Sequence, residues 1–230
     1  MTQGVQNLDF STVLASSIHD MKNSLSMLLN TLDDVMYQCE PADCRFYNGF
    51  TQLQYEGKRL NDHLIQLLAF YRINNAQYYA NITEQCLGDF LDEALLQHHE
   101  MLKFRNIEFD IDCPVDLYCF IDKDLMAGVI TNVINNLYKY TKDKMMISAY
   151  TENGYLAICI KDNGPGYPED MLYSEVKQQK GIDFKSGSTG LGLYFAILAA
   201  QMHKNKGRKG YITTTNNGIN GGGCFTIFIP

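Results

Sequence analysis

The chain has 230 residues, of which 46% are hydrophobic, so it is long enough to bury one large core or two smaller ones. Its formal net charge is -7, whereas proteins that bind the nucleic-acid backbone present a basic surface, so nucleic acid is not an expected partner. The sequence has neither a cationic start followed by an apolar segment nor a run that could span a bilayer, which predicts no signal peptide and no membrane span.

The N-terminal part carries two apolar series with alternating steps of four and three residues, the spacing of a coiled-coil seam. Pro41, in the segment CEPADC, separates them, so we expect two helices joined by a short turn, a helical hairpin. One hairpin is too small to bury its seam alone, and pairing with a second copy would complete a four-helix bundle, which predicts a homodimer. The seam positions are Leu14, Ile18, Met21, Leu25, Leu28, Leu32 and Val35, then Phe46, Phe50, Leu53, Gly57, Leu60, Leu64, Leu67 and Tyr71.

Residues 72–83 lose this spacing and are expected to be a linker, so we divide the chain into domains 1–75 and 76–230. Helical patterns in the second domain are mixed with strand patterns that are at least partly antiparallel, which indicates an α+β fold, a two-layer α/β sandwich. The predicted elements are helices at 87–104 and 123–141, strands at 106–113 and 116–122, a hairpin at 145–162 with its turn at Asn153-Gly154, and a closing strand within 221–230.

The seven cysteines are an odd number, include no CxxC pair and lie mostly in apolar runs. We therefore interpret them as reduced, buried thiols in a cytoplasmic protein. The histidines at 98, 99 and 203 show no metal-ligand spacing with them.

Asp162 ends an apolar strand and begins the segment DNGPG, in which two glycines flank a proline. A carboxylate at the end of a strand can accept a hydrogen bond from an exocyclic amine, and glycines let the backbone approach a flat ring closely. For this segment alone, an ordinary turn after a strand remains the alternative.

Residues 185–202, KSGSTGLGLYFAILAAQM, form a glycine-rich segment that leads into an apolar helix. Amides in the first turn of a helix, assisted by the helix dipole, can bind phosphate oxygens. The segment fits neither the dinucleotide fingerprint nor the phosphate loop that ends in Gly-Lys-Ser/Thr, so tight packing remains the alternative.

On the helix predicted at 123–141, Asn132, Asn136 and Lys139 are spaced by four and three residues and share one face, and Tyr140 follows. This face offers an amide oxygen for a hard divalent cation and a positive charge for phosphate. A solvated polar face is the alternative, but the apolar neighbours of these residues indicate that the helix is packed.

Together these segments resemble the two-component sensor histidine kinases. HDMKN, residues 19–23, is similar to their phosphoacceptor box, and NVINNLYKYT, residues 132–141, is similar to their asparagine box. DNGPG and STGLGL are similar to their two glycine boxes, and GGGCFTIFIP is similar to their C-terminal strand. The resemblance runs from about residue 8 to Pro230, and four motifs in the right order are more specific than any one of them.

The resemblance implies roles for three residues of the hairpin. His19 would accept the γ-phosphoryl group of ATP, Asp20 would orient or deprotonate its imidazole, and Asn23 would position water for dephosphorylation of the partner. Imidazole attacks only when one ring nitrogen is free, and a carboxylate can hold the required tautomer. Because His19 follows the core position Ile18, its side chain is expected to point to the flank of the bundle, where another domain can reach it.

The resemblance also implies an ATP site with Mg²⁺, in a domain of the histidine kinase, gyrase and heat-shock chaperone ATPase type. Asn136 would ligate Mg²⁺, Lys139 and Tyr140 would lie near the phosphates, and Asn132 would support the site. Asp162 would bind the adenine amino group. The remaining positions are Gly164 and Gly166, which would line the base pocket, and Thr189, Gly190, Leu191 and Gly192, which would form the hinge of a lid beside the phosphates.

The activity that the resemblance implies is that of an ATP-dependent protein-histidine kinase. The kinase would pass its phosphoryl group to an aspartate of a response regulator receiver domain, and could also dephosphorylate that regulator. The alternative is a non-catalytic histidine phosphotransfer or adaptor dimer with an ATPase-like docking domain. Related ATPases of the gyrase, MutL and heat-shock chaperone type share the pocket but have no reason to carry the hairpin. The sequence before His19 has no room for a sensor domain, so the signal is expected to come from a separate sensor or regulatory protein, unless the chain is a catalytic fragment or a freestanding kinase.

Overall fold

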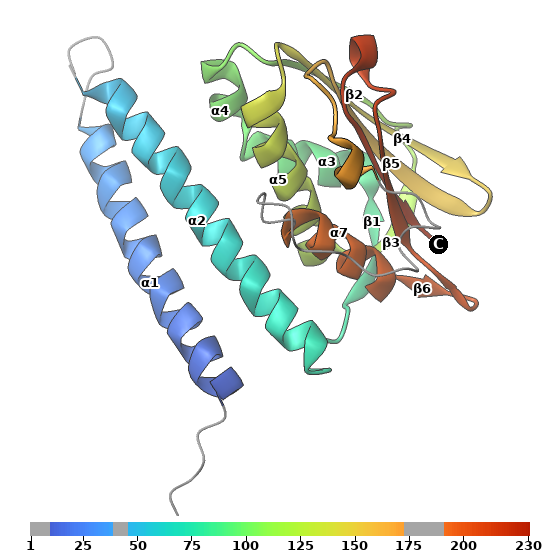
Figure 1. The fold of residues 1–230 in the computed structure, drawn as a ribbon, viewed down its shortest axis with the longest axis horizontal. Coiled ribbons are helices and arrows are strands. Elements are labelled where there is room, and N and C mark those ends of the chain that lie inside the picture. Colours follow the sequence, from blue (N-terminus) through green and yellow to red (C-terminus); the bar gives the residue numbers. More distant parts are fainter. Residues whose placement is uncertain (1–9, 39–45, 173–190) are drawn as a thin grey trace, which may run out of the picture. The chain divides into compact units, whose positions relative to one another are not determined.

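The chain divides into two compact units, residues 1–79 and residues 80–230 (Figure 1). The computed structural model describes residues 10–38, 46–172 and 191–230. Within these ranges, no helix combines the length and the apolar character needed to cross a membrane. The predicted turn in CEPADC lies outside the described residues.

The first unit is a helical hairpin of α1, Phe10–Tyr37, and α2, Tyr47–Asn74, as the seam spacing predicts. The two helices are in contact at Gly57, where a Cβ atom would lie 2.7 Å from Leu29 Cδ2. A larger side chain at this seam position would require Leu29 to move, which is consistent with a glycine in the apolar series. The hairpin is confirmed, whereas the four-helix bundle stays a prediction.

Each seam separates into two series with a step of seven residues. On α1, Ile18, Leu25 and Leu32 are buried or half-buried, and the intervening seam residues are exposed. On α2, the series that contains Phe50 and Leu64 is half-buried, and the series between its members is exposed. The exposed seam residues are Met21, Leu28 and Val35 on α1, and Phe46, Leu53, Leu60 and Leu67 on α2.

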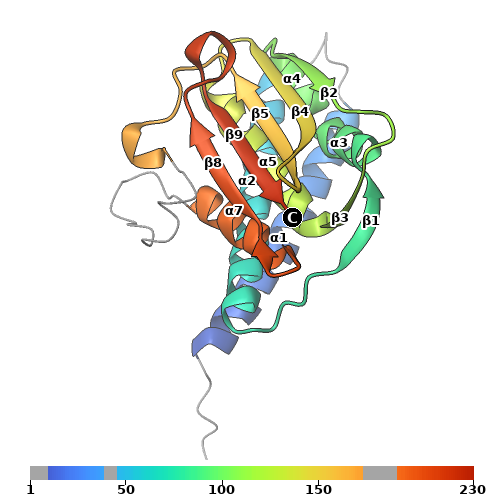
Figure 2. The same cartoon turned by 90° about the vertical axis from the view of Figure 1, so that its right-hand side faces the viewer.

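The second unit is built on a five-stranded mixed sheet with the strand order β2-β4-β5-β9-β8 (Figure 2). Strand β2 runs parallel to β4, and the other neighbours are antiparallel. The turn between β4 and β5 is the predicted one, because Asn153 and Gly154 have φ of 51° and 78°, which suits a two-residue hairpin turn. The strands are β2, Glu108–Asp112; β4, Lys144–Glu152; β5, Tyr155–Asp162; β9, Cys224–Ile229; and β8, Tyr211–Thr215.

Helices cover one face of this sheet and form the second layer of an α+β fold, as expected. These are α3, Leu87–Leu96, α5, Lys123–Tyr140, and α7, Leu191–Met202. Alternate residues of the strands face the helices, so that Ile158, Ile227 and Ile212 form one fully buried row across three strands. Burial of this row and of the apolar face of α5 fixes the register of the sheet that carries Asp162.

A second, two-stranded sheet pairs β1, Ile82–Cys86, with β3, Tyr118–Asp122. The linker prediction was wrong at both ends, since α2 continues to Asn74 and β1 begins at Ile82. The first residues of β1 are exposed, so their sequence lacks the alternation of a half-buried strand. A short hairpin joins β6, Lys204–Asn205, to β7, Arg208–Lys209, and single 3-10 turns lie at Glu169–Met171 and Ile219–Gly221.

The helix predicted at 87–104 is in fact two helices, α3 and α4, His99–Phe104. The break falls at Gln97 and His98, and the buried His98 ring lies 3.3 Å from the Thr131 hydroxyl on α5. A tertiary hydrogen bond of this kind outweighs the helical propensity of the segment, and periodicity in the sequence cannot report it.

Candidate functional site

Asp162 is the last residue of β5, and its side chain is only 6% exposed. Its Oδ1 accepts a hydrogen bond of 2.6 Å from the backbone N–H of Gly164, and its own N–H donates to the Gly223 carbonyl at 3.0 Å. Burial raises the pKa of this carboxyl above its ordinary value, and hydrogen bonds from the amides of Gly164 and Gly223 partly offset the rise. A buried, hydrogen-bonded carboxylate is therefore held at the carboxyl end of a central strand.

Three segments meet at Asp162 because glycines let them approach. A Cβ atom on Gly164 would lie 2.5 Å from the Tyr140 carbonyl oxygen at the end of α5, and one on Gly223 would lie 2.6 Å from Asp162 Oδ2. A Cβ atom on Gly222 would collide with the Asp162 carbonyl oxygen. The motif DNGPG indicates Gly164 in the sequence, whereas GGG at 221–223 indicates only the start of a strand; in the structure, Gly223 faces the Asp162 carboxylate and Gly222 faces the Asp162 backbone.

The loop after Asp162 is held by Asn216, which the sequence analysis did not identify. Its Oδ1 accepts from the Tyr167 N–H at 2.7 Å, and its Nδ2 donates to the Tyr167 carbonyl at 3.0 Å. Gly166 has φ of 80°, in the left-handed region, and a Cβ atom there would lie 2.6 Å from Asn216 Oδ1. Gly166, which is predicted to line the base pocket, thus has a left-handed conformation and lies against Asn216.

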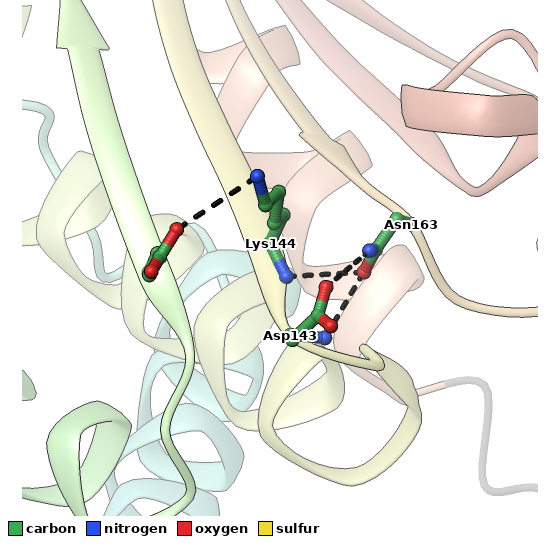
Figure 3. A network of polar contacts seen from close by, with 4 residues as sticks. Asp143, Lys144 and Asn163 are labelled. Atoms are coloured by element: carbon green, nitrogen blue, oxygen red, sulfur yellow. Dashed lines mark hydrogen bonds and ion pairs between the residues drawn. The ribbon is translucent and has the colours of Figure 1, made fainter.

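Asn163 fixes the other side of the same loop through a small polar network (Figure 3). Its Oδ1 accepts from the backbone N–H groups of Asp143 and Lys144, at 3.2 and 3.1 Å, and its Nδ2 donates to the Asp143 carboxylate at 2.6 Å. Lys144 also lies 3.8 Å from Glu108 on β2. Because Asn163 follows Asp162 directly, the network holds this loop to the beginning of β4 and limits where the Asp162 carboxylate can lie.

Helix α5 carries the four predicted residues that would face phosphates and metal. Asn132 is buried, and its amide lies so close to Gly192 in the first turn of α7 that a Cβ atom there would collide with it. Asn136, Lys139 and Tyr140 are exposed near the end of α5. The structure therefore places Asn132 against Gly192 and the backbone of Tyr140 against Gly164. The side chains of Asn136, Lys139 and Tyr140 remain exposed and accessible to a ligand.

The remaining predicted positions lie at the start of α7 or just before it. Leu191 and Gly192 are the first residues of α7 that the structure describes. Thr189 and Gly190 lie outside the described residues. No group of three or more His, Cys, Asp or Glu side chains arranged for a metal occurs in the described part of the chain. One amide oxygen at Asn136 nevertheless fits Mg²⁺, which binds through few protein ligands when substrate phosphates supply the others.

In the first unit, His19 is on the exposed side of α1, next to the buried Ile18, as predicted. Its side chain is 61% exposed. The Asn23 amide lies 3.3 Å from His19 Nδ1, and Asp20 Oδ1 lies 3.6 Å from the same nitrogen. An Asn23 amide turned so that its oxygen faces the ring would accept from Nδ1–H, and in that tautomer Nε2 keeps its lone pair for attack. All three residues of the predicted phosphoacceptor site therefore meet at one imidazole.

Comparison with known proteins agrees with this organisation. Residues 121–230 match the family described as histidine kinase-, DNA gyrase B-, and HSP90-like ATPase. The chain is 24% identical over 228 residues to hybrid signal transduction histidine kinase D of Dictyostelium discoideum, covering 94% of this chain and 14% of that protein. It is 26% identical over 215 residues to the adaptive-response sensory kinase SasA of Synechocystis, covering 86% of this chain and 55% of SasA.

Among solved structures, the histidine kinase AdeS of Acinetobacter baumannii has a similar fold, with a TM-score of 0.59 at 19% identity over 92% of this chain and 96% of that one. The chain thus spans about half the length of SasA and a smaller part of the Dictyostelium protein. The relatives cover the hairpin as well as the ATPase unit. Residues 121–230 therefore resemble the histidine kinase-, DNA gyrase B- and HSP90-like ATPases, and the chain as a whole is similar to sensor histidine kinases.

Proposed function

We propose that the protein is an ATP-dependent protein-histidine kinase that phosphorylates its own His19 and passes the phosphoryl group to an aspartate of a response regulator. The observation that carries the proposal is the buried Asp162 carboxylate at the end of β5, enclosed by glycine backbone in a domain of an ATPase family. A carboxylate in this position can accept a hydrogen bond from the adenine amino group, while the glycines leave room for the ring.

Different residues of the chain would bind the base, bind the phosphates and carry out the attack. Asp162 orients the base, Lys139 and the first turn of α7 hold phosphate oxygens, and Asn136 binds Mg²⁺, which supplies charge neutralisation on the phosphates. The Asp20 carboxylate favours the proton on His19 Nδ1, so that Nε2 attacks the γ-phosphorus. A P–N bond forms, the bond between the γ-phosphorus and the bridging oxygen breaks, and ADP leaves.

Incubation with γ-labelled ATP tests this proposal against its alternatives. A histidine kinase takes up label that is lost in acid and retained in alkali, as expected for a phosphoramidate. An adaptor dimer with an ATPase-like docking domain takes up none, and an ATPase of the gyrase or chaperone type releases labelled phosphate without a labelled protein. Either of the last two results would refute the kinase assignment.

The partners follow from the same proposal. The phosphorylated histidine needs a receiver-domain aspartate as acceptor, and the hairpin needs a second copy of itself to cover its exposed seam. We place the reaction in the cytoplasm, where ATP and reduced thiols are both available.

We predict that Leu28→Glu converts a homodimer to a monomer. Leu28 belongs to the exposed seam series and is 67% exposed, so in the dimer a glutamate would be buried against the second copy without a partner. Met27→Glu is the matched control, because Met27 is adjacent and 72% exposed but lies outside the seam. Sedimentation of the full chain should give a monomer for Leu28→Glu and a dimer for wild type and Met27→Glu. A monomeric wild type would exclude the four-helix bundle.

We also predict that Asn23→Ala retains autophosphorylation and loses dephosphorylation of the regulator. Asp20 still faces His19 Nδ1 in this variant, so the nucleophile keeps a partner. The amide that would hold a water in line with the phosphoaspartate is removed, and loss of such positioning typically costs orders of magnitude in rate. Asn30→Ala, one heptad along the same helix and also exposed, is the control. The regulator is found by screening receiver domains for rapid transfer; if Asn23→Ala dephosphorylates it at the wild-type rate, the phosphatase role is wrong.

A further inference from the structure

Cys159 on β5 and Cys224 on β9 lie side by side at the centre of the five-stranded sheet, with their sulfur atoms 3.3 Å apart. In the register of these strands, Cys159 is opposite Thr226, and Cys224 is opposite Lys161. The two cysteines are therefore diagonal neighbours with side chains on the same face. We call them the thiol pair.

The thiol pair lies on the face of the sheet opposite the helices. Figure 2 looks onto this face, and no helix or strand among the described residues of the second unit lies in front of it. The two residues are 3% and 8% exposed, because flanking side chains in the same layer shield them. Because no described helix of this unit covers the thiol pair, we expect a small oxidant to reach it more easily than a thiol beneath the helices.

The surroundings favour a thiolate on Cys159. Its pKa is lowered by a hydrogen bond from Cys224, then by Thr226, Lys161 and Ser148, and these effects outweigh the opposing effect of burial. The same hydrogen bond raises the pKa of Cys224, which keeps its proton. The thiol pair therefore combines a nucleophilic sulfur with a second thiol in contact with it.

We propose that the thiol pair is a peroxide-sensitive modification site, in which oxidation joins Cys159 to Cys224 by a disulfide bond and weakens nucleotide binding. The Cys159 sulfur attacks a peroxide oxygen, the O–O bond breaks, and the second oxygen leaves with a proton as water or alcohol, giving a sulfenic acid. Cys224 then attacks the Cys159 sulfur, an S–S bond forms, and the hydroxyl group leaves with the Cys224 proton as water. Two thiols lose two electrons, and the peroxide gains them.

The link to the nucleotide site is the residue before Cys224, and this part of the proposal rests on the proposed nucleotide function. A disulfide holds its sulfurs at about 2.05 Å, and a diagonal pair reaches this distance only if the strands shift. The start of β9 would then move Gly223, whose carbonyl accepts the Asp162 N–H at 3.0 Å and whose Cα lies against Asp162 Oδ2. Loss of one such contact should weaken nucleotide binding about fivefold or more.

Chemical modification tests the first part. The full chain is reduced, treated with hydrogen peroxide, alkylated and mapped by mass spectrometry, with Cys119 as an internal control. Cys119 is similarly buried, but burial raises its pKa to about 11, so it should stay reduced. We expect a Cys159–Cys224 crosslink in wild type, and a dimedone-trapped sulfenic acid at Cys159 in Cys224→Ser. If Cys159 and Cys224 both remain alkylatable while Cys119 oxidises, the modification site is refuted.

Nucleotide titration tests the second part and separates it from the proposed function. Reduced wild type should bind an ATP analogue, oxidised wild type should bind it at least fivefold more weakly, and a thiol reductant should restore the affinity. Cys159→Ser and Cys224→Ser should bind equally well before and after peroxide. If reduced wild type does not bind the analogue, the proposed function fails; if crosslinked protein binds with unchanged affinity, the coupling between the thiol pair and Asp162 fails.

Discussion

Replacing His19 by glutamine should abolish the uptake of acid-labile phosphate from γ-labelled ATP and leave nucleotide affinity unchanged. Glutamine preserves polarity and approximate length but has no nucleophilic nitrogen, so the P–N bond cannot form. His19 belongs to the helical hairpin, whereas Asp162 and the glycines around it belong to the ATPase unit, so the substitution does not touch the nucleotide site. We expect His19→Gln to lose phosphate labelling completely and to bind the nucleotide with unchanged affinity.

His63→Gln provides the matched control for this experiment. His63 is an exposed histidine on α2 of the same hairpin, and its replacement should leave labelling at the wild-type level. Acid-labile label in His19→Gln that disappears in the double variant would move the phosphoacceptor to His63. Equal loss of labelling and of nucleotide binding in His19→Gln would instead show that the substitution damages the fold.

The parts of this structure that follow local rules could be predicted from the sequence. The steps of four and three residues specify the hairpin of α1 and α2, and Asn153-Gly154 specifies the turn between β4 and β5. The position of Asp162 after an apolar strand is visible in the same way. In each case the information lies within a few residues of the element.

The contacts that shape the site could not be predicted, because they join segments far apart in the chain. Gly223 lies against Asp162 across the pairing of β9 with β5, and Asn216 holds Tyr167 from 49 residues away. The glycines before β9 are visible in the sequence, but their role depends on which strand is the neighbour of β5. Strand β1 was missed for the same reason, since its pairing with β3 involves backbone groups and leaves little pattern in its side chains.

Asp162→Asn is expected to weaken binding of an ATP analogue by about 5- to 150-fold, which corresponds to the loss of about 1–3 kcal/mol when a buried acceptor is removed. The carboxylate has two acceptor oxygens, and Oδ1 is already used by the Gly164 N–H. In the proposed site, Oδ2 would accept from the adenine amino group. Asparagine keeps the shape but offers one acceptor and one NH₂ donor, so the loop and the base cannot both be satisfied. Calorimetric titration measures the difference.

The pH dependence of the same titration gives an independent check on this assignment. Base binding requires the ionised carboxylate, and burial raises the pKa of Asp162 above 3.8, so wild-type affinity should fall on acidification at a higher pH than an ordinary aspartate would give. Protonation turns the Asp162 carboxylate from a hydrogen-bond acceptor into a donor, which would then face the amino group of adenine, also a donor. Asp162→Asn cannot titrate and should lack this fall, whereas Asp110→Asn, an exposed position on β2, should retain both the wild-type affinity and its pH dependence. Equal affinities of wild type and Asp162→Asn across this range would remove Asp162 from the nucleotide site.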